Sequence, residues 1–272
     1  MDKILADLGI NIDFWAVLIG WGLLFTRIFT MLILTPFLGG RGIPGRVRLV
    51  TAFVLATFVY YFIDDSMLAQ LPEDKGIIVA LFFKEIFIGF ALGLTTIMVF
   101  YAIEAGGRII DSQRGSANAQ IFLPALGRVS VFGLFQFWLG LALFCYFDGH
   151  VIFLKAFLGS FQTIPVYSLP SIGPGVTPFL QLFIRMSADV LILGLQIAAP
   201  VLIAVFLTDL VLGIANKMAP QIPVFEIGFM MKGYVGVMMV YVSISVVASQ
   251  MEVFFGVMQT NVQKVIYFFA TQ

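Results

Sequence analysis

Residues 190–208 read VLILGLQIAAPVLIAVFLT and make up nineteen consecutive positions without a charged side chain. A helix rises about 1.5 Å per residue, so about 20 apolar residues match the hydrocarbon core of a bilayer. Apolar residues continue on both sides of this run once the flanking charged residues are included. We therefore expect a long apolar helical block over Phe179–Ala215. Pro200 should kink or split this block, because it removes one backbone hydrogen bond.

The composition of the whole chain has the same character. Of its 272 residues, 61% are hydrophobic and 11% are charged, and the mean hydropathy is +1.05. Soluble globular domains have about 45–50% apolar and roughly 25% charged residues. So few charged side chains cannot cover a water-exposed surface, and a formal net charge of zero gives no sign of a nucleic-acid partner. The composition predicts an all-α protein in contact with membrane lipid, organised as a single domain over residues 1–272.

Six apolar blocks follow one another along the chain. They are Phe14–Leu38, Leu49–Ile63, Ile77–Ile103, Val129–Phe147, Phe179–Ala215 and Gly233–Phe255. Several reach the length of a membrane span only if charged residues are included, and a charge at mid-span costs about 2.5–3.5 kcal/mol unless it faces protein or water. In the third block, Gly89 and Gly93 form a GxxxG pair suited to close helix contact. We expect about six helical blocks with kinks, not all surrounded by lipid.

The charges within these blocks are candidate buried or inter-subunit residues. They are Arg27, Lys84, Glu85, Arg185, Asp189 and Asp209. Arg185 and Asp189 are four residues apart, so we expect them to neutralise each other on one helix face. Lys84 and Glu85 are adjacent and point in different directions, which predicts partners on other helices or subunits rather than with each other.

The segment 104–128, EAGGRIIDSQRGSANAQIFLPALGR, places 25 residues between two apolar blocks. A helix hairpin needs only a handful of connecting residues, and long connections are usually functional or disordered. Arg108, Asp111 and Arg114 fall at i, i+3 and i+6, so one helical face can carry compensating charges. This segment is the least ordinary part of the sequence.

Two interpretations of the same segment stand side by side. It has a flexible glycine joint at each end, small residues after Gly115, and an apolar tip at Ile121 and Phe122 that ends at Pro124. Such a loop suits the occlusion of a channel from which it can move aside. The alternative is a re-entrant or surface helix that only packs, and residue chemistry leaves both open.

Catalytic and metal-binding motifs are absent from the sequence. One histidine, His150, excludes a site built on several imidazoles, and neither HExxH nor GxSxG occurs. Asp148 beside His150 is more typical of a solvated turn. We expect no enzyme activity, no metal and no cofactor. A secondary transporter is an alternative, because broken helices with buried charges are typical of that class, and Pro200 with Arg185 and Asp189 would form its site.

The C-terminal stretch, about residues 252–269, has the pattern of an amphipathic helix. Its apolar stripe consists of Phe254, Met258, Val262, Val265 and Phe269. Such a helix either lies on the membrane surface or docks on a partner protein.

Three motifs, in this order, resemble the FliR/SctT family of small membrane proteins in the type III secretion export gate. They are GRIIDSQRG at 107–115, FLP at 122–124 and APQIPVFEIGFMMK at 219–232. The resemblance covers essentially the whole chain, in its length and in its order of blocks. The stretch IDSQRG at 110–115 looks closer to the injectisome branch, SctT, than to the flagellar branch, FliR, which is the alternative.

The resemblance implies a role that composition does not show. In this family the protein joins FliP/SctR-like and FliQ/SctS-like subunits in a helical cone that stands largely above the bacterial inner membrane, on its periplasmic side. Secreted polypeptide substrates pass unfolded through its centre. A switch protein of the FlhB/SctU type is expected nearby. The chain would then be a multi-pass inner-membrane component without enzyme activity.

The resemblance also implies site residues. In the family the loop between the third and fourth blocks acts as a pore plug, which corresponds to Gly106–Pro124 here. Its positions are Gly106, Arg108, Asp111, Arg114, Gly115, Ile121, Phe122 and Pro124. The family's late loop corresponds to Pro220, Gln221, Pro223 and Phe225.

Overall fold

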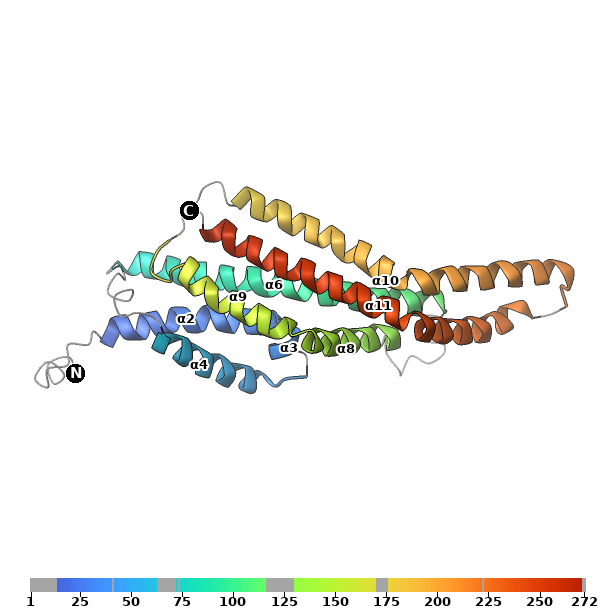
Figure 1. Ribbon diagram of the computed structural model, residues 1–272, viewed down its shortest axis with the longest axis horizontal. Helices are drawn as coiled ribbons and strands as arrows, with labels where there is room; N and C mark the ends of the chain where they lie inside the picture. The colour runs from blue at the N-terminus through green and yellow to red at the C-terminus, as the bar shows by residue number, and fades with distance from the viewer. Residues whose placement is uncertain are drawn as a thin grey trace, which may run out of the picture. The chain divides into compact units, whose positions relative to one another are not determined.

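The computed structural model describes residues 14–40, 42–62, 72, 74–115, 130–169, 176–221 and 223–270. These residues form eight α-helices and, within the same ranges, no strand (Figure 1). In chain order the helices are α2 (Phe14–Leu34), α3 (Pro36–Gly39), α4 (Gly45–Phe62), α6 (Lys75–Gln113), α8 (Val131–Tyr146), α9 (Gly149–Thr163), α10 (Val176–Met218) and α11 (Val224–Ala270). The all-α prediction is confirmed.

Five of the described helices, α2, α4, α6, α10 and α11, are long and apolar enough to cross a membrane. The pair α8 and α9 makes a sixth candidate if its two helices are counted together. They are separated at Phe147 and Asp148, and Asp148 has a φ of 55°, a left-handed conformation that aspartate tolerates better than most residues. The expectation of about six apolar helical blocks is therefore confirmed.

Two blocks differ in extent from the expectation. α10 runs continuously through Pro200, so the proline does not split it. A proline removes a single helical hydrogen bond, and apolar neighbours can keep the rest of the helix intact. α11 joins the sixth block and the expected C-terminal helix into one helix of 47 residues.

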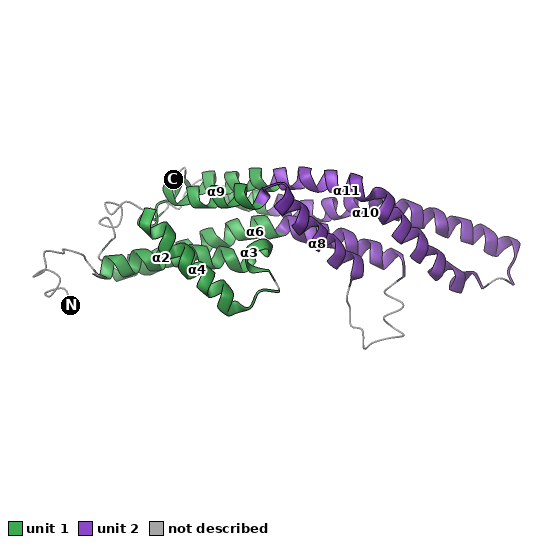
Figure 2. Ribbon diagram, turned by 60° about the horizontal axis from the view of Figure 1, so that its bottom comes forward, with its two compact units in different colours: residues 1–97, 150–183, 258–272 green, residues 98–149, 184–257 purple. Residues whose placement is uncertain are grey.

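The chain divides into two compact units, coloured separately in Figure 2. Unit 1 contains residues 1–97, 150–183 and 258–272, and unit 2 contains residues 98–149 and 184–257. Each unit brings together segments that are far apart in the sequence, because α6, α10 and α11 contribute residues to both. A single functional domain over the whole chain stays a prediction.

In unit 1, α2 packs closely against the first part of α6. A Cβ atom at Gly89 would lie 2.5 Å from the carbonyl oxygen of Arg27, and one at Gly93 would lie 2.8 Å from Cβ of Leu34. The two backbones approach this closely because neither glycine has a side chain. The expected role of the GxxxG pair in close helix contact is confirmed.

The end of α11 also lies in unit 1, and its apolar stripe is covered by the chain itself. Met258, Val262, Val265 and Phe269 are all buried. The Phe269 ring lies 5.7 Å from the ring of Phe87 on α6, measured between centroids. This burial corrects the expectation that the stripe lies on the membrane or docks on a partner. Helices of the same chain satisfy it instead.

In unit 2, the second part of α6 packs against α10 and α8. The centre of this contact consists of Ile110, Ala198, Val201 and Val205. Small residues bring the helices together. A Cβ atom at Gly106 would lie 3.0 Å from the carbonyl oxygen of Gly194 on α10, and one at Gly140 on α8 would lie 3.1 Å from Cδ1 of Ile103. The result is a closely packed support for the end of α6.

Candidate functional site

The segment expected to form a plug begins later than its motif. α6 continues to Gln113, so residues 104–113 are helical and the connection to α8 starts at Arg114. Gly106 and Gly107 are buried inside α6 rather than forming a flexible joint. A Cβ atom at Gly106 would lie 2.9 Å from Cγ2 of Ile197, and one at Gly107 would overlap the carbonyl of Phe132 on α8. These glycines serve close packing, so the expected start of the plug at Gly106 is corrected to Arg114.

The apolar tip of the expected plug lies outside the described residues. Ile121, Phe122 and Pro124 all belong to the stretch 116–129, which separates Gly115 from Ser130. The candidate site is therefore the base of this loop, where α6 ends and α8 begins. The loop 116–129 is called here simply the loop.

The charges at the end of α6 form two separate ion pairs. Nη2 of Arg114 lies 3.0 Å from Oδ1 of Asp111, and Nη2 of Arg108 lies 2.5 Å from Oε1 of Glu104. Asp111 is buried, whereas the Arg108 side chain is 59% exposed. The expected compensation among Arg108, Asp111 and Arg114 is therefore correct for the last two only, because Glu104, one turn earlier, provides a partner for Arg108.

The second oxygen of Asp111 binds the start of α8. Oδ2 accepts hydrogen bonds from the hydroxyl of Ser130 at 2.7 Å and from the backbone N–H of Phe132 at 2.9 Å. The Ser130 hydroxyl oxygen also accepts from the N–H of Gly133 at 2.9 Å, which makes Ser130 the N-cap of α8. One carboxylate thus holds residues on both sides of the loop.

Arg114 and Gly115 fix the direction in which the chain leaves α6. The Arg114 guanidinium lies 4.2 Å from the centre of the Phe132 ring, a cation–π contact. Its side chain also passes over Gly236 of α11, where a Cβ atom would overlap it. Gly115 has a φ of 79°, which favours glycine, and a Cβ atom there would lie 2.6 Å from the Phe229 ring. Of the expected glycine joints, Gly115 is the one whose backbone needs a glycine.

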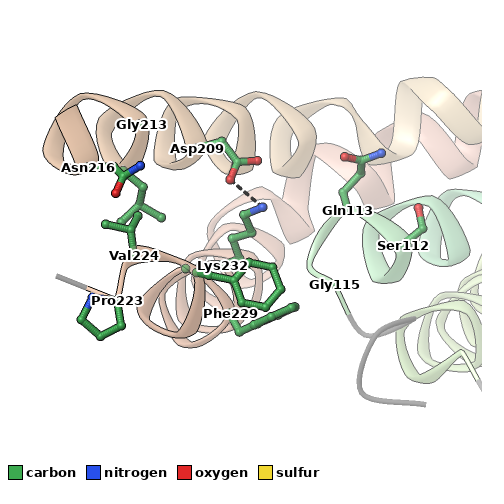
Figure 3. Close-up of a pocket in the computed structure, with 13 residues that line it drawn as sticks. Ser112, Gln113, Gly115, Asp209, Gly213, Asn216, Pro223, Val224, Phe229 and Lys232 are labelled. Carbon is green, nitrogen blue, oxygen red and sulfur yellow. Dashed lines mark ion pairs between the residues drawn. The ribbon is translucent and has the colours of Figure 1, made fainter. Parts of the chain in front are cut away.

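A pocket of about 620 Å³ lies beside the end of α6 (Figure 3). It is lined by Ser112, Gln113, Gly115, Asp209, Leu212, Gly213, Asn216, Pro223, Val224, Phe225, Gly228, Phe229 and Lys232. The structure thus brings Gly115 from the plug motif together with Asp209 and with Pro223 and Phe225 from the late loop. Pro220 and Gln221 lie in the exposed turn between α10 and α11 and do not line this pocket.

An ion pair crosses the pocket between α10 and α11. Nζ of Lys232 lies 2.5 Å from Oδ1 of Asp209, and the Asp209 side chain is 48% exposed (Figure 3). Asp209, expected at a buried or inter-subunit position, is therefore partly exposed and finds its partner within the chain. Sequence reasoning missed Lys232, although Asp209 precedes Pro220 by eleven positions and Lys232 follows Gln221 by eleven. Residues equally distant from a short turn face each other in an antiparallel helix hairpin.

The buried charges of unit 1 form a second network, also within the chain. Arg27 and Glu85 are fully buried and joined by two hydrogen bonds, from Nε to Oε2 and from Nη2 to Oε1, the second at 3.0 Å. Nζ of Lys84 lies 2.8 Å from Oε1 of Glu85. This contact corrects the expectation that adjacent Lys84 and Glu85 do not pair, because the long lysine side chain can turn back across the helix surface.

The two cations of this network also bind the end of α9. Arg27 donates to the carbonyl oxygens of Ser160 and Ile164, at 3.2 and 2.9 Å. Lys84 donates to three carbonyl oxygens in the turn that follows, those of Pro165, Val166 and Ser168. Carbonyls at a helix C-terminus have no intrahelical partner and need donors. The described structure therefore gives Arg27, Lys84 and Glu85 partners inside the chain, and no other subunit is needed to neutralise them.

Arg185 and Asp189 do not behave as expected. Arg185 is exposed and Asp189 is half-buried on α10, and no ion pair joins them among the described residues. A basic residue four positions before an acidic one pairs less favourably on a helix than the reverse order. Their expected mutual neutralisation is therefore not part of this structure.

These features define a class of protein. It is a multi-pass helical membrane protein with ion pairs buried between its helices and with a loop whose two ends are held by one carboxylate.

The particular family follows from comparison with known proteins. Residues 18–258 match the family described as bacterial export proteins, family 1, and the chain belongs to this family. The chain is 32% identical to the flagellar biosynthetic protein FliR of Bacillus subtilis (strain 168) over 228 residues, which cover 83% of this chain and 86% of that protein. It is 31% identical to FliR of Escherichia coli (strain K12) over 225 residues, 82% of each.

A relative from a different export system matches as well. The chain is 27% identical over 217 residues to the Yop proteins translocation protein T of Yersinia pestis, 79% of this chain and 82% of that protein. Both branches of the family named by the sequence motifs are thus represented, and these identities do not separate them. The chain is a multi-pass component of the export apparatus in the bacterial inner membrane. The family consists of structural components of that apparatus rather than of enzymes.

Proposed function

We propose that this chain is a core subunit of the type III secretion export gate. It helps to form the channel through which unfolded proteins cross the inner membrane, and its loop closes the pore. One observation supports the plug above all. The fourteen residues of the loop connect Gly115 to Ser130, two points that Asp111 and its partners hold together. A connection between joined points needs only a few residues, so the additional length has another purpose.

The proposed partners are FliP/SctR-like and FliQ/SctS-like subunits, with a FlhB/SctU-like switch protein nearby. Three of the apolar helices, α4, α10 and α11, leave most of their surface uncovered by the chain itself. Phe53, Phe206 and Tyr241 are examples of large side chains that are more than half exposed. In the proposed gate these faces meet sibling subunits as well as lipid, and part of the chain stands above the membrane on the periplasmic side.

Deletion of residues 116–129 tests the plug. Because Asp111, Ser130 and the close contacts of α6 lie outside the deletion, we expect the shortened chain to co-purify with its FliP-like and FliQ-like partners at normal yield. We also expect cells that carry it to leak small ions or dyes. A fourteen-residue glycine–serine replacement is the matched control for chain connectivity. It should assemble and leak as well, because the apolar tip is gone.

The opposite result identifies a different role for the loop. If the deletion abolishes co-purification while the glycine–serine replacement restores both assembly and a tight membrane, the loop is a structural brace and not a plug. If both variants assemble without leakage, pore closure depends on another part of the gate.

A further inference from the structure

We propose that Asp111 is the positioning residue that sets where the loop leaves the two helices, and that this setting keeps the resting gate closed. The inference rests on the proposed function of the loop as a plug. It assigns to one buried carboxylate the task of holding Arg114 on one side of the loop and Ser130 and Phe132 on the other.

The two oxygens of Asp111 divide this task between them. Oδ1 accepts from the guanidinium of Arg114, the first residue after α6, and Oδ2 accepts from Ser130 and Phe132 at the start of α8. The Asp111 side chain is only 7% exposed. Hydrogen bonds to a buried charged group are stronger than neutral ones, and the donors have no water to replace a lost acceptor. Loss of Asp111 therefore releases both ends of the loop at once.

The helices themselves do not depend on Asp111. α6 and α8 meet through glycines along their length. Gly107 lies directly against the Phe132 carbonyl, a Cβ atom at Gly133 would lie 3.1 Å from Cγ of Arg108, and Gly140 packs against Ile103. These contacts remain when the carboxylate is removed. Asp111 consequently positions the loop on a helix pair that is already assembled, which separates its role from a general contribution to folding.

Arg114 transmits this position to a third helix. Its guanidinium is held between Asp111 and the Phe132 ring, and its side chain crosses Gly236 of α11. Without Asp111, Arg114 loses its charged partner, and residues 114, 115 and 130 can detach from the helix ends. The loop then becomes longer at its base and its entry direction is no longer fixed. A plug released in this way occupies its closed position for a smaller share of the time.

The test measures leakage through the assembled gate in cells that carry single variants. Asp111→Ala should leave co-purification with the FliP-like and FliQ-like subunits unchanged and raise ion or dye leakage by about tenfold, the shift expected from losing hydrogen bonds to a buried charge. Arg108→Ala is the matched control. It removes an ion pair from the same helix one turn away, at an exposed position, and should leave leakage at the wild-type level.

Conservative variants distinguish positioning from folding. Ser130→Thr keeps a hydroxyl and should remain closed, whereas Ser130→Ala should leak in the same direction as Asp111→Ala. Asp111→Cys combined with Ser130→Cys, in a Cys145→Ser background, allows the two sides to be joined by a short bis-thiol reagent. We expect this bridge to restore a tight membrane and a reducing agent to reopen it. A merely structural role for Asp111 would not give reversible closure.

Each outcome is assigned. Loss of assembly in Asp111→Ala, or normal assembly without leakage, overturns the positioning role. A bridged cysteine pair that leaks as much as the unbridged pair overturns it as well. If deletion of residues 116–129 leaks while Asp111→Ala does not, this inference fails and the proposed plug stands. If the deletion itself does not leak, the plug fails first, and Asp111 is then no more than a cap of α8.

Discussion

Arg27 of α2 and Glu85 of α6 are joined by two hydrogen bonds across 58 positions of sequence, and both side chains are fully buried. The same guanidinium donates to the carbonyl oxygens of Ser160 and Ile164. One arginine therefore joins α2, α6 and the end of α9 inside unit 1. The pair belongs to the interior of this chain, which changes the expected effect of removing it.

We expect Glu85→Ala to impair folding of the chain rather than only its association with other subunits. The substitution leaves Arg27 and Lys84 buried without their carboxylate, which costs about 3–5 kcal/mol. Thermal unfolding in detergent and the yield of inserted chain measure this effect. Asp209→Ala removes a partly exposed pair and should cost less than about 1 kcal/mol. Normal stability of Glu85→Ala combined with poor co-purification would instead return Glu85 to an inter-subunit role.

Arg27→Ala in combination with Glu85→Ala gives a second check. Because the two side chains bind each other, we expect the double variant to lose less stability than the sum of the single variants, by about 0.5–3 kcal/mol. Additive losses in thermal unfolding would show that the two residues act independently.

Lys84→Met is expected to loosen the turn after α9. The variant keeps most of the side-chain volume but removes the donor to the carbonyls of Pro165, Val166 and Ser168, at a cost of about 1–3 kcal/mol. Hydrogen exchange or limited proteolysis over residues 164–169 measures the change. Lys155→Met, at an exposed position on α9, is the matched control and should leave the turn protected. Equal protection in both variants would contradict a capping role for Lys84.

Gly89→Ala is expected to separate α2 from α6. The added methyl group would lie 2.5 Å from the carbonyl oxygen of Arg27, and overpacking of this kind costs about 1–3 kcal/mol. Gly159→Ala is the control in the same unit, because no atom of the described chain lies within 4 Å of its Cβ position. It should be neutral or stabilise its helix by roughly 0.5–1 kcal/mol. Equal thermal stability of the two variants would count against the close helix contact.

Gly115→Ala is expected to disturb the base of the loop. An alanine at a φ of 79° costs about 1–2 kcal/mol, and its methyl group would meet the Phe229 ring. We expect lower thermal stability together with increased leakage through the assembled gate. Gly213→Ala, with open space at its Cβ position on α10, is the control and should be silent in both measurements. Wild-type behaviour of Gly115→Ala would show that the base can adjust its backbone.

Some of the site was within reach of sequence reasoning. Asp209 and Lys232 lie equally far from the turn between α10 and α11, so an antiparallel hairpin alone would have paired them. Ser130, directly before an apolar run, had the pattern of an N-cap. The partner of Arg108 was missed because its pairing with Glu104 competes locally with the expected pairing to Asp111.

The sequence by itself determined the helical class, the apolar blocks and the family, because hydropathy, periodicity and motif order are properties of neighbouring residues. Only the tertiary structure decided that Gly106 and Gly107 are packing positions, that Arg27 meets Glu85, and that Asp111 binds both sides of the loop. Those contacts depend on which helix faces which. In a chain with 61% hydrophobic residues, nearly every face is apolar enough to pack against any other. The few polar groups therefore find partners wherever close packing places them, and their spacing along the chain does not reveal those partners.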